Sequence, residues 1–406
     1  NRRNVVLGQM KKYDYLNESL VDSLRVQPLN LNYTPESHRE GLATYFREYL
    51  RAHMKMWIND EKNRKPDGSK YNLNTDGLKI YTTINYSMQE MAENAVLQHM
   101  PRLQKEFFEQ NETLDDSIAP FRDLTSGAVD TLLRISMRRS ERWRKMKYDL
   151  KKNDEEIEES FYIPKEMTVF SWKGEIDTTM SPLDSMKYYK SFFRPGMMSM
   201  DPTNGYIKAW VGGMNYRHFQ YDMVKKGKRQ IGSTFKPFVY AAAIDQLKLS
   251  PCDTFPDSQF CIEKNKFGNV EQWCPKNSGD KYGRTRTLKN ALANSVNTVT
   301  ARLIDRIGPR TVVKLAKDLG IEQRILPVPS IALGTPDLSV YEMVAAYSTF
   351  ANKGVYTQPV FIEKIEDKNG TTLYENQPIT RDVLSEEAAY VTVNLLEGVT
   401  KAGSGT

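Results

Sequence analysis

The sequence predicts an α+β fold in which an antiparallel sheet is flanked by helices. Residues 196–211 read as two short strands joined by the turn-forming run Asp201-Pro-Thr-Asn-Gly205. Residues 76–84 alternate apolar and polar side chains as a strand does, and residues 88–96 then repeat apolar side chains at helical spacing. From Ser233 onward the pattern is mainly helical, with one expected helix over residues 288–307.

The length of the chain predicts more than one domain. At 406 residues it exceeds what a single hydrophobic core usually organises, so we expect two or three domains. Residues 1–60 read as helical, with Val5, Val6, Met10, Tyr13 and Leu16 forming an apolar stripe. Residues 61–195 form a linker, which holds a strongly charged stretch over 101–160 and a small β-rich element over 164–195. For the charged stretch, a solvated helical insertion is favoured over a docking patch.

Composition restricts the partners of the chain. The 57 basic and 51 acidic residues give a net charge of +6, which fits an anionic cell-wall or membrane surface and does not indicate nucleic acid. No run approaches 18 apolar residues, so neither a membrane span nor a signal peptide is expected within the chain. Because the chain begins with Asn1 instead of Met, we expect that an upstream part is missing.

Cysteine and histidine usage favours a disulfide over a metal site. The four histidines lack metal-ligand spacing, so no metal is expected. Cys252, Cys261 and Cys274 lie in one short segment, which leaves two interpretations open: a disulfide in an oxidising compartment, or buried thiols. Cys261 and Cys274 flank a hairpin-like stretch around Phe267-Gly268-Asn269, and they are the preferred pair.

The most informative motif is a serine three residues before a lysine, Ser233 and Lys236. On a helix the two side chains share one face. A lysine activates a serine nucleophile only when it is neutral, so Lys236 is expected to be desolvated or close to other cations. Gly232 and Pro237 favour a helix that begins here, where backbone N–H groups stabilise an oxyanion. An exposed helix start without chemistry is the alternative for an isolated motif of this kind.

A second polar element, Ser295 and Asn297, follows Ser233 by 62 residues. In sequence order the two elements read SxxK and then SxN. Alone, Ser295 and Asn297 are equally well explained as residues that cap or terminate a helix. Their position after the first motif and after the hairpin favours a functional role.

Together these motifs resemble the transpeptidase domain of the class A, bifunctional, penicillin-binding proteins, which have a β-lactamase-like fold. The resemblance implies that residues 1–60 are the helical end of a glycosyltransferase domain, without its catalytic glutamates. It implies that residues 196–406 are the transpeptidase domain. The family's third motif, Lys-Thr/Ser-Gly, has no counterpart, because Lys401-Ala-Gly403 has the wrong middle residue. We therefore expect a transpeptidase domain truncated before its third-motif strand, with an incomplete active site.

The resemblance also implies an activity, that of a serine D,D-transpeptidase that cross-links peptidoglycan stem peptides, supports cell shape and is acylated by β-lactam antibiotics. Ser233 is the implied nucleophile and Lys236 its base. Ser295 relays a proton, and Asn297 holds the lysine and donates to a substrate carbonyl. No cofactor is implied. The implied location is the periplasmic face of the cytoplasmic membrane, with an anchoring helix upstream of this chain.

Three further residues match family segments near the substrate cleft: Trp273, Asn277 and Thr335. We expect all three to contact substrate, although a turn role for Asn277 is equally compatible with the sequence. Thr335 is expected to shape a loop and do no chemistry.

Two other functions remain open for the whole chain. In a serine D,D-carboxypeptidase or β-lactamase, water replaces the acceptor amine. In a non-catalytic wall-binding scaffold, the fold is kept without the activity.

Overall fold

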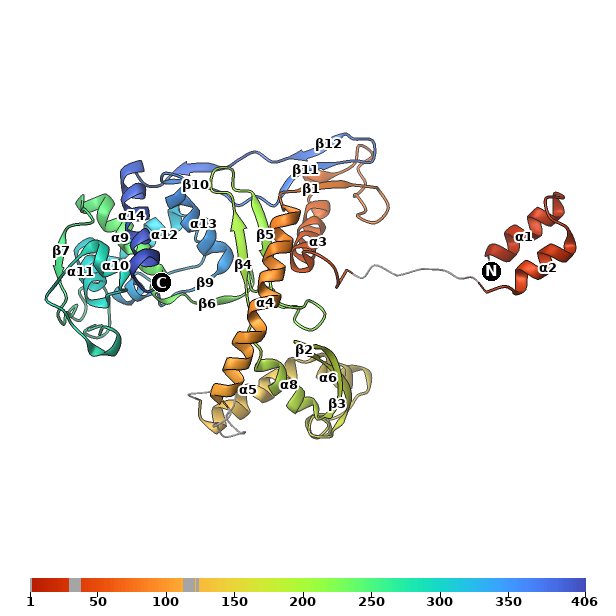
Figure 1. Ribbon diagram of the computed structural model, residues 1–406, viewed down its shortest axis with the longest axis horizontal. Helices are drawn as coiled ribbons and strands as arrows, with labels where there is room; N and C mark the ends of the chain where they lie inside the picture. The colour runs from red at the N-terminus through yellow and green to blue at the C-terminus, as the bar shows by residue number, and fades with distance from the viewer. Residues whose placement is uncertain (1, 29–37, 112–120, 122–123) are drawn as a thin grey trace. The chain divides into compact units, whose positions relative to one another are not determined.

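The computed structural model describes residues 2–28, 38–111, 121 and 124–406 (Figure 1). It contains two compact units, Asn1–His38 and Arg39–Thr406. The smaller unit pairs α1 (Arg2–Lys12) with α2 (Glu18–Val26). Its buried apolar side chains are Leu7 and Val21, whereas the stripe residues Val5, Val6 and Tyr13 are at least half exposed. The predicted stripe is therefore wrong in this unit, because a helix pair buries only the side chains that lie between its members.

The strands of the larger unit form small antiparallel sheets instead of the one sheet that was predicted. One sheet has three strands in the order β1-β11-β12, and the others described are strand pairs. The α+β class itself is confirmed. The strands are β1 (Lys79–Thr82), β2 (Lys165–Ser171), β3 (Gly174–Met180), β4 (Met197–Met200), β5 (Ile207–Val211), β6 (Lys228–Gln230), β7 (Thr254–Pro256), β8 (Thr285–Thr287), β9 (Asp337–Ser339), β10 (Val355–Thr357), β11 (Ile362–Glu366), β12 (Thr372–Glu375) and β13 (Thr380–Asp382).

The predicted hairpin over 196–211 is confirmed as the antiparallel pair β4–β5. Alternate side chains of β5 point to opposite faces, as in any strand. Trp210 packs against Phe46 and Tyr49 of α3 (Thr44–Asn59), while Ala209 and Val211 cluster with Ala92 of α4 (Tyr86–Asn111). Both faces of β5 are therefore buried. Because α3 packs on β5, it belongs to the larger unit and not with residues 1–28, unlike the predicted segment 1–60.

The described part of residues 121–193 forms a small core of its own. Its elements are α5 (Ser126–Arg139), α6 (Glu141–Arg144), α7 (Asp154–Glu159), the hairpin β2–β3 and α8 (Pro182–Lys190). Val129, Leu133, Met137 and Ile157 are buried in it. Its charged residues pair at the surface, as Lys152 does with Glu156. Helices and a hairpin are thus present where the sequence predicts helical and β-rich stretches, and residues 112–120 and 122–123 lie outside the described residues.

The largest hydrophobic core surrounds α9 (Lys236–Leu247), which is buried continuously from Lys236 to Ile244. Its alanines, Ala241 to Ala243, allow neighbouring helices to approach closely. The helices α11, α12 and α14 pack directly on α9. The helices of this region are α10 (Leu288–Ala293), α11 (Asn297–Ile307), α12 (Pro309–Asp318), α13 (Val340–Ala351) and α14 (Glu386–Ala402), with the short helical turns η3 (Gly232–Phe235), η4 (Ser278–Asp280) and η5 (Pro329–Leu333).

The single helix predicted over residues 288–307 is wrong. The chain forms α10, leaves the helix at Asn294 and re-enters it as α11 at Asn297. The break lies at Ser295, whose φ of +54° is left-handed and incompatible with a continuous right-handed helix.

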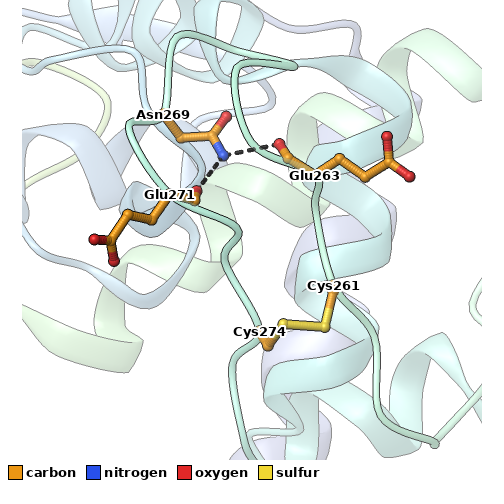
Figure 2. Close-up of a disulfide and its surroundings, with 5 residues drawn as sticks. All are labelled: Cys261, Glu263, Asn269, Glu271 and Cys274. Atoms are coloured by element: carbon orange, nitrogen blue, oxygen red, sulfur yellow. Dashed lines mark hydrogen bonds between the residues drawn. A yellow bond between two sulfur atoms is a disulfide. The ribbon is translucent and has the colours of Figure 1, made fainter.

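The loop between β7 and β8 is closed by a disulfide that joins Cys261 to Cys274, which confirms the preferred pair (Figure 2). Within the loop, the Asn269 side chain donates to the carbonyl oxygens of Glu263 and Glu271 at 2.9 and 2.7 Å. Cys252 is a free, exposed thiol.

Within the ranges that the structure describes, no helix is both long and apolar enough to cross a bilayer.

We predict that Gly334→Ala destabilises the fold. Gly334 has φ +73°, and a Cβ there would lie 1.8 Å from the carbonyl oxygen of Gly232, so the chain would have to move apart beside Ser233. The free energy of unfolding in denaturant is expected to fall by more than about 1 kcal/mol. The control is Gly127→Ala in α5, where no heavy atom lies within 4 Å of the new Cβ. Equal effects of the two substitutions would contradict the prediction.

We predict that the double variant Cys261→Ser/Cys274→Ser is less stable than the wild type. The disulfide spans 13 residues, and closing a loop of this size stabilises a protein by about 3 kcal/mol. Thermal unfolding of the two proteins measures the difference, with Cys252→Ser as the control that leaves the loop intact. A double variant as stable as this control would show that the loop is held by its other contacts.

Candidate active site

Ser233 lies in the 3₁₀ turn η3, directly before the N-terminus of α9. Gly232 enters the turn with φ +55°, a conformation that glycine adopts without strain. Pro237 is the second residue of α9, where its missing N–H leaves no helical hydrogen bond unmade. The Ser233 side chain is exposed, while Lys236, one 3₁₀ turn later, is 1% exposed. The local structure thus exposes the hydroxyl and buries the amine.

The Lys236 ammonium group contacts the second predicted element. Its Nζ donates to the Ser295 carbonyl oxygen at 2.6 Å, to Ser295 Oγ at 2.9 Å and to Asn297 Oδ1 at 2.6 Å. All three acceptors are uncharged. Since no carboxylate among the described residues compensates for the loss of water, burial lowers the pKa of Lys236 to about 8. Within the described residues, no hydrogen bond joins Nζ to Ser233.

The geometry at Ser295 depends on its unusual backbone. A serine with φ +54° is strained by about 1–3 kcal/mol, and the surrounding contacts must hold it. This conformation breaks the helix and brings both the carbonyl and the hydroxyl of Ser295 to the same nitrogen, Lys236 Nζ. A continuous helix would use the carbonyl oxygen in its own hydrogen bonds.

Asn297 is the first residue of α11 and holds the lysine with one end of its amide. Its Oδ1 accepts from Lys236, and its Nδ2 donates to the carbonyl oxygen of Lys276 at 2.7 Å. One N–H of this amide remains for another acceptor.

The three predicted substrate contacts lie in different surroundings. Asn277 uses both ends of its amide inside the protein: Nδ2 donates to Asp257 and to the Lys281 carbonyl, and Oδ1 accepts from the backbone of Asn297 and Thr298. This supports the structural alternative for Asn277. Asn277 nevertheless lies beside Asn297 and is therefore part of the site.

Trp273 and Thr335 are not joined to Lys236, Ser295 or Asn297 by any described contact. Trp273 pairs with Ile262 across the disulfide loop and packs on the main core. Thr335 is exposed and follows Gly334, whose carbonyl oxygen accepts from the Gly232 N–H at 2.9 Å. Thr335 is thus next to the turn that carries Ser233, as expected of a loop-shaping position.

Lys401 lies on α14 and pairs with Glu397 at 2.7 Å. Among the described residues, no hydrogen bond or ion pair joins it to the SxxK or SxN residues.

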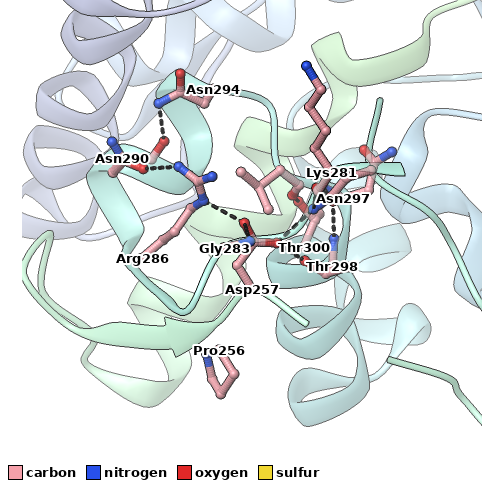
Figure 3. Close-up of polar contacts among 12 residues, drawn as sticks. Pro256, Asp257, Lys281, Gly283, Arg286, Asn290, Asn294, Asn297, Thr298 and Thr300 are labelled. Atoms are coloured by element: carbon pink, nitrogen blue, oxygen red, sulfur yellow. Dashed lines mark hydrogen bonds and ion pairs between the residues drawn. The ribbon is translucent and has the colours of Figure 1, made fainter. Parts of the chain in front are cut away.

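Sequence reasoning missed the group behind these residues, the carboxylate of Asp257 (Figure 3). Asp257 is fully buried and accepts hydrogen bonds from Asn277, Gly283, Arg286 and Thr298. No motif marked it, because a single sequence does not show which of its 51 acidic residues is buried. The weak signal available was its place directly after the strand-like run Thr254-Phe-Pro256.

Comparison with known proteins matches two family models to the chain. Residues 116–193 match the penicillin-binding protein middle domain, and residues 196–406 match the penicillin-binding protein transpeptidase domain. Penicillin-binding protein 1A of Aquifex aeolicus is 27% identical over 99% of this chain and 53% of that protein. Penicillin-binding protein 2D of Bacillus subtilis is 35% identical over 50% of this chain and 29% of that protein. The chain thus spans about half the length of the first relative and less of the second.

The fold is also that of a solved relative. The crystal structure of penicillin-binding protein 1A from Haemophilus influenzae matches with a TM-score of 0.63 at 20% identity, over 100% of this chain and 64% of that one. The transpeptidase match alone covers more than half of the residues. The chain therefore belongs to the penicillin-binding protein transpeptidase family, among its class A members.

Proposed function

We propose that this chain carries the D,D-transpeptidase activity that cross-links peptidoglycan stem peptides through a serine acyl-enzyme. The observation that supports it most is the environment of Lys236: a buried amine with three neutral acceptors, one 3₁₀ turn after an exposed serine. Burial lowers the pKa of the amine to about 8, close enough to neutrality for it to act as a base.

In the acylation step a proton leaves Ser233, an ester bond to Ser233 forms, and the peptide bond to the terminal D-alanine breaks. Ser233 Oγ attacks the carbonyl carbon of the penultimate D-alanine, and neutral Lys236 removes the hydroxyl proton. Ser295 Oγ, which is hydrogen-bonded to Nζ at 2.9 Å, passes a proton to the nitrogen of the breaking peptide bond. D-Alanine leaves with that proton, and the stem peptide remains as an ester on Ser233.

The second step returns the enzyme to its starting state. An amine of a neighbouring stem peptide attacks the ester, its proton passes back through Ser295 and Lys236, and Ser233 is released. Through these steps the remaining amide N–H of Asn297 donates to a substrate carbonyl. A β-lactam enters the first step in the same way, and its ester on Ser233 persists.

The proposal extends to the organisation of the whole protein. Residues 196–406 supply the Ser233 and Asn297 segments, residues 61–195 are a linker that includes the small core described within 121–193, and the α1–α2 unit is the helical end of a glycosyltransferase domain. The donor and acceptor substrates are stem peptides of peptidoglycan, so the protein acts in the periplasm, attached to the cytoplasmic membrane by an upstream helix. Longer relatives, of which this chain spans about half, support this arrangement.

We predict that Ser233→Ala in the full-length protein abolishes covalent labelling by a fluorescent penicillin, because it removes the attacking oxygen. The readout is the fluorescent band on a denaturing gel. Thr234→Ala is the matched control: its hydroxyl is adjacent in sequence but donates to the Ile231 carbonyl, so labelling should persist. Equal labelling of wild type and Ser233→Ala, or none in either, would favour the scaffold function instead.

Deacylation separates the transpeptidase from a hydrolase. After labelling, excess penicillin is removed and the remaining fluorescence on the wild-type protein is followed over time. A label that persists for hours is expected of a transpeptidase without its acceptor amine. Rapid loss of the label would assign the site to a β-lactamase or carboxypeptidase.

We predict that the acylation rate constant rises with pH and levels off above about pH 8. Only neutral Lys236 accepts the serine proton, and its pKa is lowered to about 8, so the neutral fraction increases about tenfold per pH unit below that value. Stopped-flow acylation across this range gives the profile. Lys236→Arg should abolish acylation, since a guanidinium stays protonated, whereas substitution of the exposed Lys401 on α14, Lys401→Arg, should leave the profile unchanged. A flat wild-type profile would exclude Lys236 as the base.

A further inference from the structure

The proposed chemistry does not use Asp257, although this carboxylate is among the most elaborately bonded groups in the molecule. It is fully buried and follows β7. Its Oδ1 accepts from Asn277 Nδ2 at 2.7 Å and from Thr298 Oγ1 at 2.8 Å. Its Oδ2 accepts from Arg286 Nε at 2.6 Å and from the Gly283 N–H at 2.9 Å (Figure 3).

Asp257 is charged in this environment. Burial by itself raises the pKa of the carboxyl group, but the hydrogen bonds from Arg286, Thr298, Asn277 and Gly283 outweigh burial and leave its pKa below the ordinary value. A charged carboxylate only accepts hydrogen bonds. Every group that faces Asp257 must therefore present a donor to it.

This requirement fixes the orientation of the Asn277 side-chain amide. With Nδ2 turned to Asp257 and to the Lys281 carbonyl, Oδ1 necessarily points the other way. There it accepts from the backbone N–H groups of Asn297 and Thr298 at 3.0 and 3.2 Å. A reversed amide would set its NH₂ against these two N–H groups and its oxygen against the carboxylate. Asp257 thus selects the orientation in which Asn277 caps α11.

The cap places the side chain that binds the lysine. Asn297 is the first residue of α11, so the two hydrogen bonds that Asn277 Oδ1 accepts from the first backbone N–H groups of this helix hold the backbone from which the Asn297 amide projects. Thr298, the next residue, is held directly by Asp257 through its hydroxyl. Asn297 Oδ1 then lies 2.6 Å from Lys236 Nζ.

We propose that Asp257 is a positioning residue for Lys236: through Asn277 and the first turn of α11 it keeps Asn297 Oδ1 in contact with Lys236 Nζ. Asp257 touches neither Ser233 nor Lys236, so it acts only by way of these groups. The kinetic consequence rests on the proposed function, but the positioning itself does not.

The first test is structural and independent of activity. In crystals of full-length Asp257→Asn, the new NH₂ group faces the donors either of Asn277 and Thr298 or of Arg286 and Gly283, so at least one of these bonds must break. We expect the Asn277 amide to turn or withdraw and Asn297 Oδ1 to leave hydrogen-bonding distance of Lys236 Nζ. An unchanged contact between these two atoms would overturn the proposal.

The second test is kinetic. Acylation by a penicillin is resolved into the noncovalent dissociation constant and the acylation rate constant. Asp257→Asn should lower the rate constant about 10- to 100-fold, the loss typical of outer residues that orient metal ligands, and leave the dissociation constant unchanged. A rate constant equal to that of the wild type would overturn the proposal.

Asp222→Asn is the matched control for loss of a buried carboxylate. Asp222 is 6% exposed and accepts from the Val224 N–H at 2.8 Å, beside the Trp210 cluster and away from the Lys236 contacts. The acylation rate constant of Asp222→Asn should equal that of the wild type, even if this variant is less stable. If Asp222→Asn slows acylation as much as Asp257→Asn does, the effect is general destabilisation and the proposal fails.

Asn277→Ala keeps the proposal testable if Asp257→Asn does not fold. This substitution removes the amide that connects Asp257 to the first turn of α11, but it leaves Asp257 with its hydrogen bonds from Arg286, Gly283 and Thr298. It should reproduce the structural change and the slower acylation, and normal values for both would overturn the proposal. If even the wild type is not acylated, the proposed function fails, and the crystal structures alone decide whether Asp257 positions Lys236.

Discussion

The burial of one amine, Lys236 Nζ, among neutral oxygen atoms is the constraint on which the rest of the site depends. An ammonium group in a fold normally finds a carboxylate or reaches water. Here it has the carbonyl and hydroxyl of Ser295 and the amide oxygen of Asn297. These acceptors satisfy the hydrogen bonds of the amine without a countercharge, so desolvation governs its pKa. A carboxylate in their place would keep the lysine protonated.

The fold meets this constraint by making α9 its central helix. Neighbouring helices pack on α9, and its first residue is already inside the core. Ser233 stays exposed because the chain is still in the preceding 3₁₀ turn, which Gly334 contacts closely. The chain therefore enters the core between Ser233 and Lys236. As a result, an accessible hydroxyl and a buried amine lie only three residues apart.

One pair of acceptors is on a strained residue, and the contacts around it include a buried charge. Ser295 has a left-handed backbone, and Asn297 begins a new helix directly after it. Such a break needs support, and Asn277 and Asp257 provide it through hydrogen bonds to the first two residues of α11. Family membership explains why the SxxK and SxN residues occur together, whereas these hydrogen bonds give a physical reason for the position of Asn297.

The sequence alone determined the motifs, the α+β class, the β4–β5 hairpin and the β2–β3 element, and it made Cys261 and Cys274 the preferred pair. Each of these depends on local signals: residue spacing, alternation, turn residues or a hairpin-like loop. Only the tertiary structure decided that residues 288–307 are two helices and that Asn277 is an internal cap. It also decided that Asp257 is buried behind the site. These properties depend on contacts between segments far apart in the chain, and no local pattern in one sequence encodes which partners will meet.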